Sequence, residues 1–180
     1  MRYTAKEREI FTLSAESLAP WLLGKLLCRK LPDGKIIKVK ICEVEAYNAD
    51  DTANYGYGFQ GNGGDKHATK ANTPLFEQGG TCCIYAGMFL IVAGETGKSD
   101  NVLIRACADK ENKYCGPLKT ADVLKISSSK NLHGADILNS EEIWLEDDTL
   151  IGAICISKRI GLGKNVNAKD SEKRCRFIAI

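Results

Sequence analysis

Residues 35–47 read Lys-Ile-Ile-Lys-Val-Lys-Ile-Cys-Glu-Val-Glu-Ala-Tyr, and this stretch decides the fold. Its alternation of apolar residues with lysines is typical of a β-strand that buries one face. The residues predicted on the buried face are Ile37, Val39, Ile41, Glu43, Glu45 and Tyr47. A carboxylate on such a face is costly unless it is paired or hydrogen-bonded. The end of the strand is therefore expected to enter a cleft, unless a bulge turns one glutamate to solvent.

The elements around this strand mix helices and strands without a regular βαβ repeat. Residues 14–30 are expected to form a short helix capped by Ser14 or Ser17, and 32–34 a turn. A long polar loop is predicted at 48–73, then two strands around a tight turn at Ala86-Gly87. The other predicted elements are a strand at 102–108, a helix at 116–126 and strands at 153–161 and 174–180. We expect one α+β domain, residues 1–180, with a mostly antiparallel sheet, flanking helices and a protruding β-hairpin.

The composition is that of an ordinary globular protein: 180 residues, 44% hydrophobic, 27% charged, net charge +2. The opening residues are charged and no apolar run approaches membrane length, which predicts an intracellular protein with no membrane partner. Lysine and arginine gather at 29–40, 110–130 and 158–176, and acidic residues at 141–148. This distribution is compatible with a basic face, suited to a phosphate backbone, opposite an acidic one. An ordinary solvated surface explains it equally well.

Eight cysteines are present, and only two histidines accompany them. No CxxC spacing occurs, so a zinc site is weakly supported, and no metal or cofactor is predicted. Without a secretory signal, thiols are favoured over disulfides. Most are expected to act as small buried hydrophobic residues; they are Cys28, Cys42, Cys82, Cys83, Cys107, Cys115, Cys155 and Cys175.

Several short motifs suggest other chemistries and fail on context. Residues 56–61 fit GxGxxG but lack the preceding strand and following helix of a dinucleotide site. Residues 94–99 resemble a phosphate-binding loop that is two residues too short. Glu43 and Glu45 are neighbours on one strand, so they do not flank a sugar as a glycosidase pair does. Neither histidine lies near a serine or cysteine elbow, so a hydrolase triad is unsupported.

A series of motifs extends over nearly the whole chain. In order they read LLGKLL (22–27), PDG (32–34), EVEAY (43–47), DDTA (50–53), TKANTPLF (69–76), AGM (86–88), VLIRA (102–106), GPLK (116–119) and RIG (159–161). Their order and spacing resemble the alkyladenine (3-methyladenine) DNA glycosylase family. The resemblance implies a fold like the C-terminal domain of formyltransferases, and a monomer that acts on double-stranded DNA in base excision repair.

The resemblance also implies a mechanism without cofactor or covalent enzyme intermediate. Glu45 would be the general base that activates water to hydrolyse the N-glycosidic bond of a flipped-out alkylated or deaminated purine. Arg105 would position that water and the carboxylate, and the backbone carbonyl of Ile160 would contact the water. A buried salt bridge between Glu45 and Arg105 with no catalytic role is the alternative for these residues.

The family's aromatic base pocket maps onto three tyrosines. Tyr47 would form one wall, Tyr55 stands where the family has a histidine, and Tyr85 would be the third wall. Ala93 falls where the family has an asparagine that screens the purine 2-position. The resemblance therefore implies a more open pocket, compatible with 2-amino bases.

The hairpin tip departs from the family pattern. Ala86 stands where a tyrosine normally fills the gap left by the flipped base, so Met88, or Tyr85 turned outward, would be the DNA wedge. The glycine-rich segment 56–66 has no counterpart. These departures leave open a catalytically weak lesion-binding protein on the same fold. A substrate-binding domain of the formyltransferase type is the third alternative.

Overall fold

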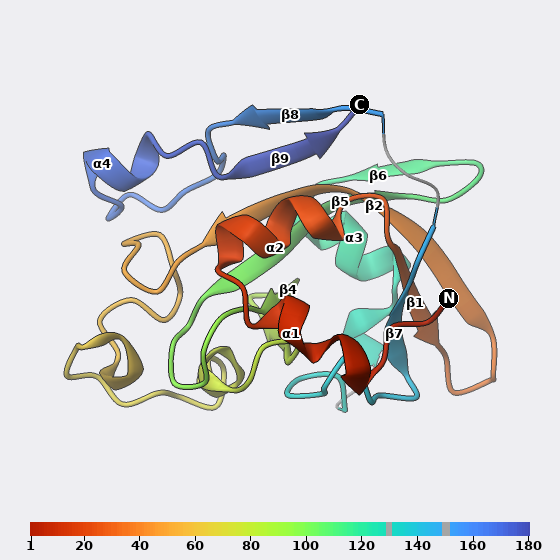
Figure 1. Ribbon diagram of the computed structural model, residues 1–180, viewed down its shortest axis with the longest axis horizontal. Helices are drawn as coiled ribbons and strands as arrows, with labels where there is room; N and C mark the ends of the chain where they lie inside the picture. Colours follow the sequence, from red (N-terminus) through yellow and green to blue (C-terminus); the bar gives the residue numbers. More distant parts are fainter. Residues whose placement is uncertain (129–130, 149–151) are drawn as a thin grey trace.

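The computed structural model describes residues 1–128, 131–148 and 152–180, and a curled antiparallel sheet forms its centre (Figure 1). Six strands are hydrogen-bonded in the order β3–β4–β5–β2–β1–β7; β6 pairs with β5, and β9 with β2 and β8. The strands are β1 (Leu26–Lys30), β2 (Ile36–Tyr47), β3 (Cys82–Tyr85), β4 (Met88–Val92), β5 (Asn101–Ala108), β6 (Lys113–Cys115), β7 (Ile143–Glu146), β8 (Ile154–Ser157) and β9 (Arg176–Ala179). The predicted α+β class with a mostly antiparallel sheet is confirmed.

Strand β2 changes the face that it buries half-way along its length. Its register with β5 shifts twice: between Ile41 and Glu43 it leaves Cys42 of β2 as the extra residue of a β-bulge, and between Glu43 and Val44 it leaves Arg105 of β5 without a partner. Val39 and Ile41 lie in the main core before the bulge, and Val44 and Ala46 lie there after it. The prediction of one continuous face through Tyr47 is therefore wrong. The bulge turns Glu43, Glu45 and Tyr47 to the face opposite the main core.

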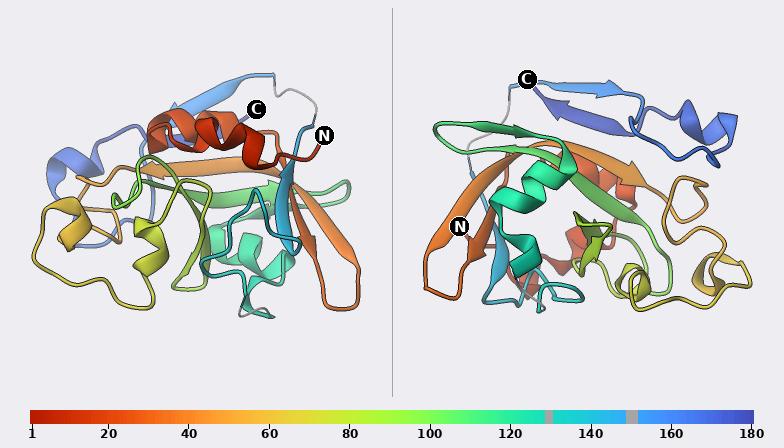
Figure 2. Two further views of the ribbon diagram at one scale, coloured as in Figure 1. Left: turned by 60° about the horizontal axis from the view of Figure 1, so that its bottom comes forward. Right: turned by 180° about the vertical axis from the view of Figure 1, so that it is seen from behind.

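Three helices contribute to the main core: α1 (Arg8–Phe11), α2 (Ala15–Leu22) and α3 (Pro117–Val123). Figure 2 shows α2 and α3 close to the long strands of the sheet. The Ser14 side chain caps α2 by accepting a hydrogen bond from the Ser17 backbone, as predicted. The predicted helix extends too far, because Leu23 is extended and Gly24 has a φ of 80°. The leucines at 26 and 27 belong to β1 instead.

A second, smaller core lies on the other face of β2–β5, the face that carries Glu45. Its buried members are Tyr47, Leu75, Cys83, Leu90, Val92 and Leu103. They alternate along each strand with residues of the main core, as side chains of a strand must. The last strand, β9, lies beside this end of β2. It pairs with β2 at 43–45, beyond residues 36–40 that pair with β1, and α4 (Ala168–Ser171) precedes β9 in the chain.

Of the two alternatives left open for the charged segments, a basic face opposite an acidic one does not hold between β2 and the segment around β7. Lys38 and Lys40 in β2 bind Glu146 at 2.6 Å and Asp148 at 2.8 Å. The acidic segment 141–148 therefore lies beside the basic segment 29–40, because β7 and β2 both pair with β1. Within the described residues, no helix is long and apolar enough to span a membrane.

All eight cysteines are free thiols. Five are buried, as expected of small hydrophobic residues, whereas Cys115 and Cys155 are exposed and Cys42 is half-buried. Burial raises the pKa of Cys28 and of Cys107 to about 12. Among the described residues, no group of three or more histidine, cysteine or acidic side chains could hold a metal ion.

Candidate active site

Glu45 is the centre of the site, and its side chain is completely buried. The Tyr47 hydroxyl donates a hydrogen bond to Glu45 Oε2 at 2.7 Å, and the Ile160 backbone N–H donates to Oε1 at 2.9 Å. Arg105 Nη1 is 3.3 Å from Oε2. Both carboxylate oxygens therefore have donors, which is what a buried carboxylate requires.

Arg105 connects two of the predicted site residues, Glu45 and Ile160, and also contacts Glu43. Its Nε atom contacts Glu43 Oε1 at 3.1 Å, and its Nη1 atom contacts the Ile160 carbonyl at 3.4 Å as well as Glu45. Arg176 in β9 is 2.8 Å from the same Glu43 oxygen. Two glutamates and two arginines thus alternate in one network, in which each charge has an opposite partner.

The aromatic residues predicted to hold a base lie together beside this network. Tyr55 and Tyr85 stack with ring centroids 4.2 Å apart and an interplanar angle of 24°. Both pack against the second core, of which Tyr47 is a member. Met88 and Leu162 pack there too. Sequence reasoning missed Leu162, although it directly follows the RIG segment (159–161) that had already been singled out.

The Tyr47 hydroxyl is a donor rather than an acceptor here. Burial, with the Glu45 carboxylate beside it, raises its pKa far above the ordinary value of a tyrosine. Burial also raises the pKa of Tyr55, with a smaller contribution from Tyr85. The neutral hydroxyl of Tyr47 therefore fixes one side of the Glu45 carboxylate at every physiological pH.

Ala93 does not join the site. It is fully buried in the main core, with Phe89 and Ile91, whereas Met88, Leu90 and Val92 point to the site face. The prediction that Ala93 borders the base is wrong because Ala93 and Met88 are five residues apart and point to opposite faces of the sheet. Ala93 therefore no longer supports the more open pocket that the resemblance implied.

The hairpin tip is small. Ala86 has a φ of 48°, and both Ala86 and Gly87 are exposed between Tyr85 and Met88, which pair across the turn. Met88 is half-buried against the second core. The structure thus places both predicted wedge residues next to the tyrosines.

The long loop is tied down close to the site by buried polar groups. Asn54 donates to three backbone carbonyls, those of Tyr47, Asn48 and Ser99. Asn62, from the 56–66 insertion, donates to the Ser99 hydroxyl at 2.5 Å. Gly56 has no room for a side chain, because a Cβ atom there would lie 2.2 Å from Ser99 Oγ. The insertion is therefore a packed part of the fold, beginning directly after Tyr55.

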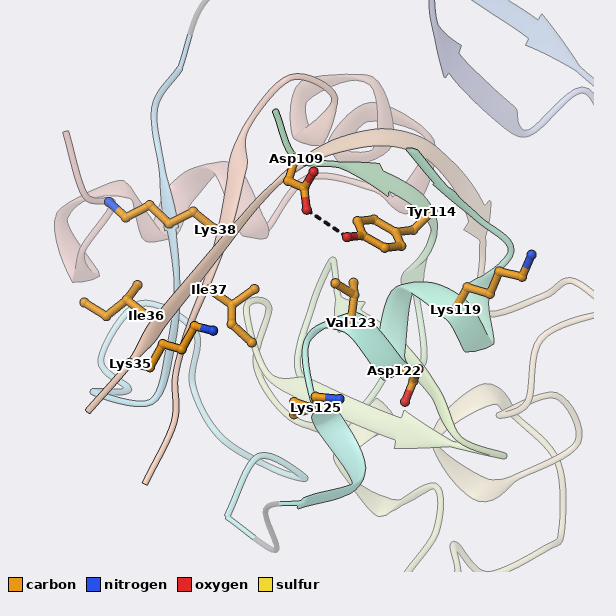
Figure 3. Close-up of a pocket in the computed structure, with 10 residues that line it drawn as sticks. All are labelled: Lys35, Ile36, Ile37, Lys38, Asp109, Tyr114, Lys119, Asp122, Val123 and Lys125. Atoms are coloured by element: carbon orange, nitrogen blue, oxygen red, sulfur yellow. Dashed lines mark hydrogen bonds between the residues drawn. The ribbon is translucent and has the colours of Figure 1, made fainter. Parts of the chain in front are cut away.

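A separate hollow of the surface lies away from this site. It has a volume of about 680 Å³ and opens between the start of β2 and α3 (Figure 3). Asp109 accepts a hydrogen bond from the Tyr114 hydroxyl at 2.8 Å, and four lysines line the hollow together with Ile36, Ile37 and Val123. The described residues that line it do not include Glu45, Arg105 or the tyrosines of the second core. The volume of a hollow does not by itself identify an active site, and buried titratable groups are the better indication.

Comparison with known proteins agrees with this geometry. The sequence pattern of the methylpurine-DNA glycosylase family matches residues 9–179, which is nearly the whole chain. The chain belongs to this family. It is 30% identical over 177 residues to a protein of Chlorobium phaeobacteroides, covering 87% of this chain and 85% of the relative. A Mesorhizobium japonicum protein is 33% identical over 182 residues, covering 89% and 80%. Both relatives are provisionally named 3-methyladenine DNA glycosylases.

Family membership confirms the resemblance drawn from the sequence motifs. It assigns the chain to the DNA glycosylases, which are hydrolases of DNA repair, and makes DNA its substrate. A relative from Clostridium perfringens, 30% identical over 195 residues and covering 91% of this chain, carries the same provisional name.

Proposed function

We propose that this protein is a monofunctional DNA glycosylase that hydrolyses the N-glycosidic bond of flipped-out alkylated or deaminated purines. Glu45 supports the proposal most directly. A completely buried carboxylate that receives a tyrosine hydroxyl, an arginine and a backbone N–H is costly to build for stability alone. Such a carboxylate beside a cluster of aromatic rings suits a reaction in which water is activated next to a bound base.

In the proposed mechanism, water lies between Glu45 and the anomeric carbon of the extruded nucleotide. Glu45 takes one proton of the water while the water oxygen attacks the anomeric carbon. The carbon–nitrogen bond breaks and the base leaves with its electron pair, so a cationic alkylated purine leaves as a neutral base and a deaminated purine leaves as an anion that takes a proton from solvent. Arg105 and the Ile160 carbonyl, 3.4 Å apart, orient the water. The arginine also balances the charge of the two glutamates.

The tyrosines would select the base. An electron-poor alkylated or deaminated purine stacks favourably on a tyrosine ring, and Tyr47, Tyr55 and Tyr85 offer such faces in one cluster. Extrusion is required because the bonds of a stacked base are shielded inside the duplex. Met88 and Ala86, next to this cluster at the hairpin turn, would occupy the gap left in the stack.

The test is single-turnover base release from labelled duplexes that contain hypoxanthine or ethenoadenine, with alkali cleaving the abasic sites. Loss of the general base in Glu45→Gln should slow release by about 10²–10⁴-fold. Glu141→Gln is the matched control, since the Glu141 side chain is exposed and Glu141 lies far from Glu45 in the sequence. Release at an equal rate by the wild type and Glu45→Gln would refute this mechanism while keeping the glycosylase.

The same experiment separates the enzyme from a lesion-binding protein. Tight binding of the damaged duplexes with no release from either, nor from DNA that contains 3-methyladenine, would favour a binding protein on this fold. Equal binding of undamaged DNA or RNA would instead favour a substrate-binding domain without a base pocket.

A further inference from the structure

The segment that follows β8, residues 158–160, contacts the central residues of the site but is not paired with any strand. Ser157 is the last residue of β8, and Lys158, Arg159 and Ile160 have no regular secondary structure. Yet Ile160 donates its N–H to Glu45 and its carbonyl accepts from Arg105. Some other interaction must fix this backbone, because an unpaired segment at a chain surface is ordinarily free to move.

Arg159 provides that interaction. Its side chain is completely buried, and its guanidinium group donates three hydrogen bonds. Nη1 donates to the Ala46 carbonyl at 3.1 Å, and Nη2 donates to Asp51 Oδ2 and to the Asp170 carbonyl, both at 2.8 Å. Ala46 lies between Glu45 and Tyr47 in β2, so the guanidinium joins the segment directly to the strand that carries the site.

The guanidinium also lies against Tyr47. Its central carbon is 4.7 Å from the centroid of the Tyr47 ring, in cation–π geometry. The positive charge lowers the pKa of Tyr47, against the larger opposing effects of burial and Glu45. It therefore strengthens the tyrosine hydroxyl as a donor to Glu45 Oε2, since a more acidic donor makes a stronger hydrogen bond.

The charge of Arg159 is balanced locally. Asp51, only 1% exposed, pairs with Arg159 at 2.8 Å and with Lys173 at 3.2 Å. Lys173 pairs in turn with Asp170 at 2.8 Å. This network joins Arg159 to the loop after β2, to α4 and to Lys173 just beyond it, and none of its described groups is hydrogen-bonded to Glu45.

We infer that Arg159 is a positioning residue of the active site, which aims the donors of both Glu45 oxygens, Ile160 N–H at Oε1 and Tyr47 hydroxyl at Oε2. The inference rests on the proposed function for its rate prediction, and on the structure alone for its spectroscopic one. Lysine at this position keeps the charge but cannot donate to three acceptors in a fork.

Arg159→Lys should therefore slow single-turnover base release at saturating enzyme by about 10- to 100-fold, the effect of one misplaced hydrogen bond to a charged group. The dissociation constant for a lesion duplex should change less than threefold. Lys158→Ala is the matched control in the same segment, because the Lys158 ammonium lies at the surface, where it pairs with Glu172. Its saturating rate should equal that of the wild type.

The spectroscopic readout is the amide proton resonance of Ile160 in ¹⁵N-labelled protein without DNA. Its hydrogen bond to a carboxylate should place it downfield, and both Glu45→Gln and Arg159→Lys should move it upfield. If Arg159→Lys lowers only the melting temperature, leaving this resonance and the saturating rate unchanged, the residue is merely structural and the inference is refuted.

Asp51→Asn provides a second variant in case Arg159→Lys does not fold. It keeps an oxygen acceptor for Nη2, so a smaller upfield shift of the same amide and a smaller loss of rate are expected. An unchanged amide in folded Asp51→Asn would also count against the inference. If the wild type releases no base at all, the proposed function fails, and the amide shifts still decide whether Arg159 aims the donor to Glu45.

Discussion

Replacing Tyr47 by phenylalanine isolates one hydrogen bond of the site. The Tyr47 hydroxyl donates to Glu45 Oε2 at 2.7 Å, with Glu45 fully buried and Tyr47 7% exposed. Phenylalanine fills the same space and keeps both the ring packing and the Arg159 contact. A hydrogen bond to a charged group contributes about 1.5–3 kcal/mol, and little solvent is present here to replace it. We expect the free energy of unfolding to fall by about that amount.

Urea unfolding followed by circular dichroism at pH 7 measures this loss. For a protein of this size, about 1.5–3 kcal/mol corresponds to a melting temperature lower by roughly 3–12 °C. Tyr55→Phe is the control, because no hydrogen bond of the Tyr55 hydroxyl is found among the described residues. A Tyr47→Phe protein within about 0.5 kcal/mol of the wild type, or a Tyr55→Phe protein equally destabilised, would refute the reasoning.

The pH dependence of that difference has a definite sign. The pKa of Tyr47 is raised in the folded protein, chiefly by burial, so the folded state holds this proton more tightly than the unfolded state does. The stabilisation is therefore complete below the unfolded pKa of about 10, and it decreases as the pH rises above that value. The gap between wild type and Tyr47→Phe should be constant from pH 6 to 9 and should narrow above pH 10.

Two further substitutions, the second with a control substitution, test other parts of the fold. Although burial raises the pKa of Asp170, hydrogen bonds from Lys173 and Thr52 outweigh it and hold the pKa well below its usual range. The ionised form thus stabilises the fold above about pH 4, and urea unfolding of wild type and Asp170→Asn should converge as the pH falls below 4. Gly24→Ala forces a side chain into a left-handed backbone and should lower the unfolding free energy by about 1–2 kcal/mol. Gly163→Ala, in open space, should lie within about 0.5 kcal/mol of the wild type.

Most of the strands were predictable because their alternation is local. The pattern at 35–47 predicted β2 to within one residue, and the turn at Ala86-Gly87 predicted the β3–β4 hairpin. The end of α2 was missed, since a glycine inside a leucine-rich stretch is compatible with helix until its φ is known. A β-bulge was left open as an alternative, but its position at Cys42 could not be predicted, because it is set by pairing with β5, about 60 residues away in the chain.

The site itself depended on contacts that no local pattern contains. Arg105 and Ile160 lie 60 and 115 residues from Glu45. The motif series brought them together through the family resemblance, whereas alternation alone gave only the two carboxylates. The alternation could not reveal which residue holds Ile160 in place, because the groups that accept hydrogen bonds from Arg159 come from β2, the following loop and α4.

The Ala93 error shows how the two kinds of reasoning could have corrected each other. A strand that turns Met88 to the site must turn Ala93 away, because side chains alternate and the two are five residues apart. Counting from the motif alone ignored this constraint. In a regular strand Ile41 and Glu45, four residues apart, would lie on the same face. Ile41 is buried in the main core, so it cannot lie on the site face with Glu45. A bulge between Ile41 and Glu45 is the simplest way to place Ile41 in the main core and Glu45 on the site face. Cys42 is that bulge, and because of it Glu45 is buried beside hydrogen-bond donors rather than in the hydrophobic core.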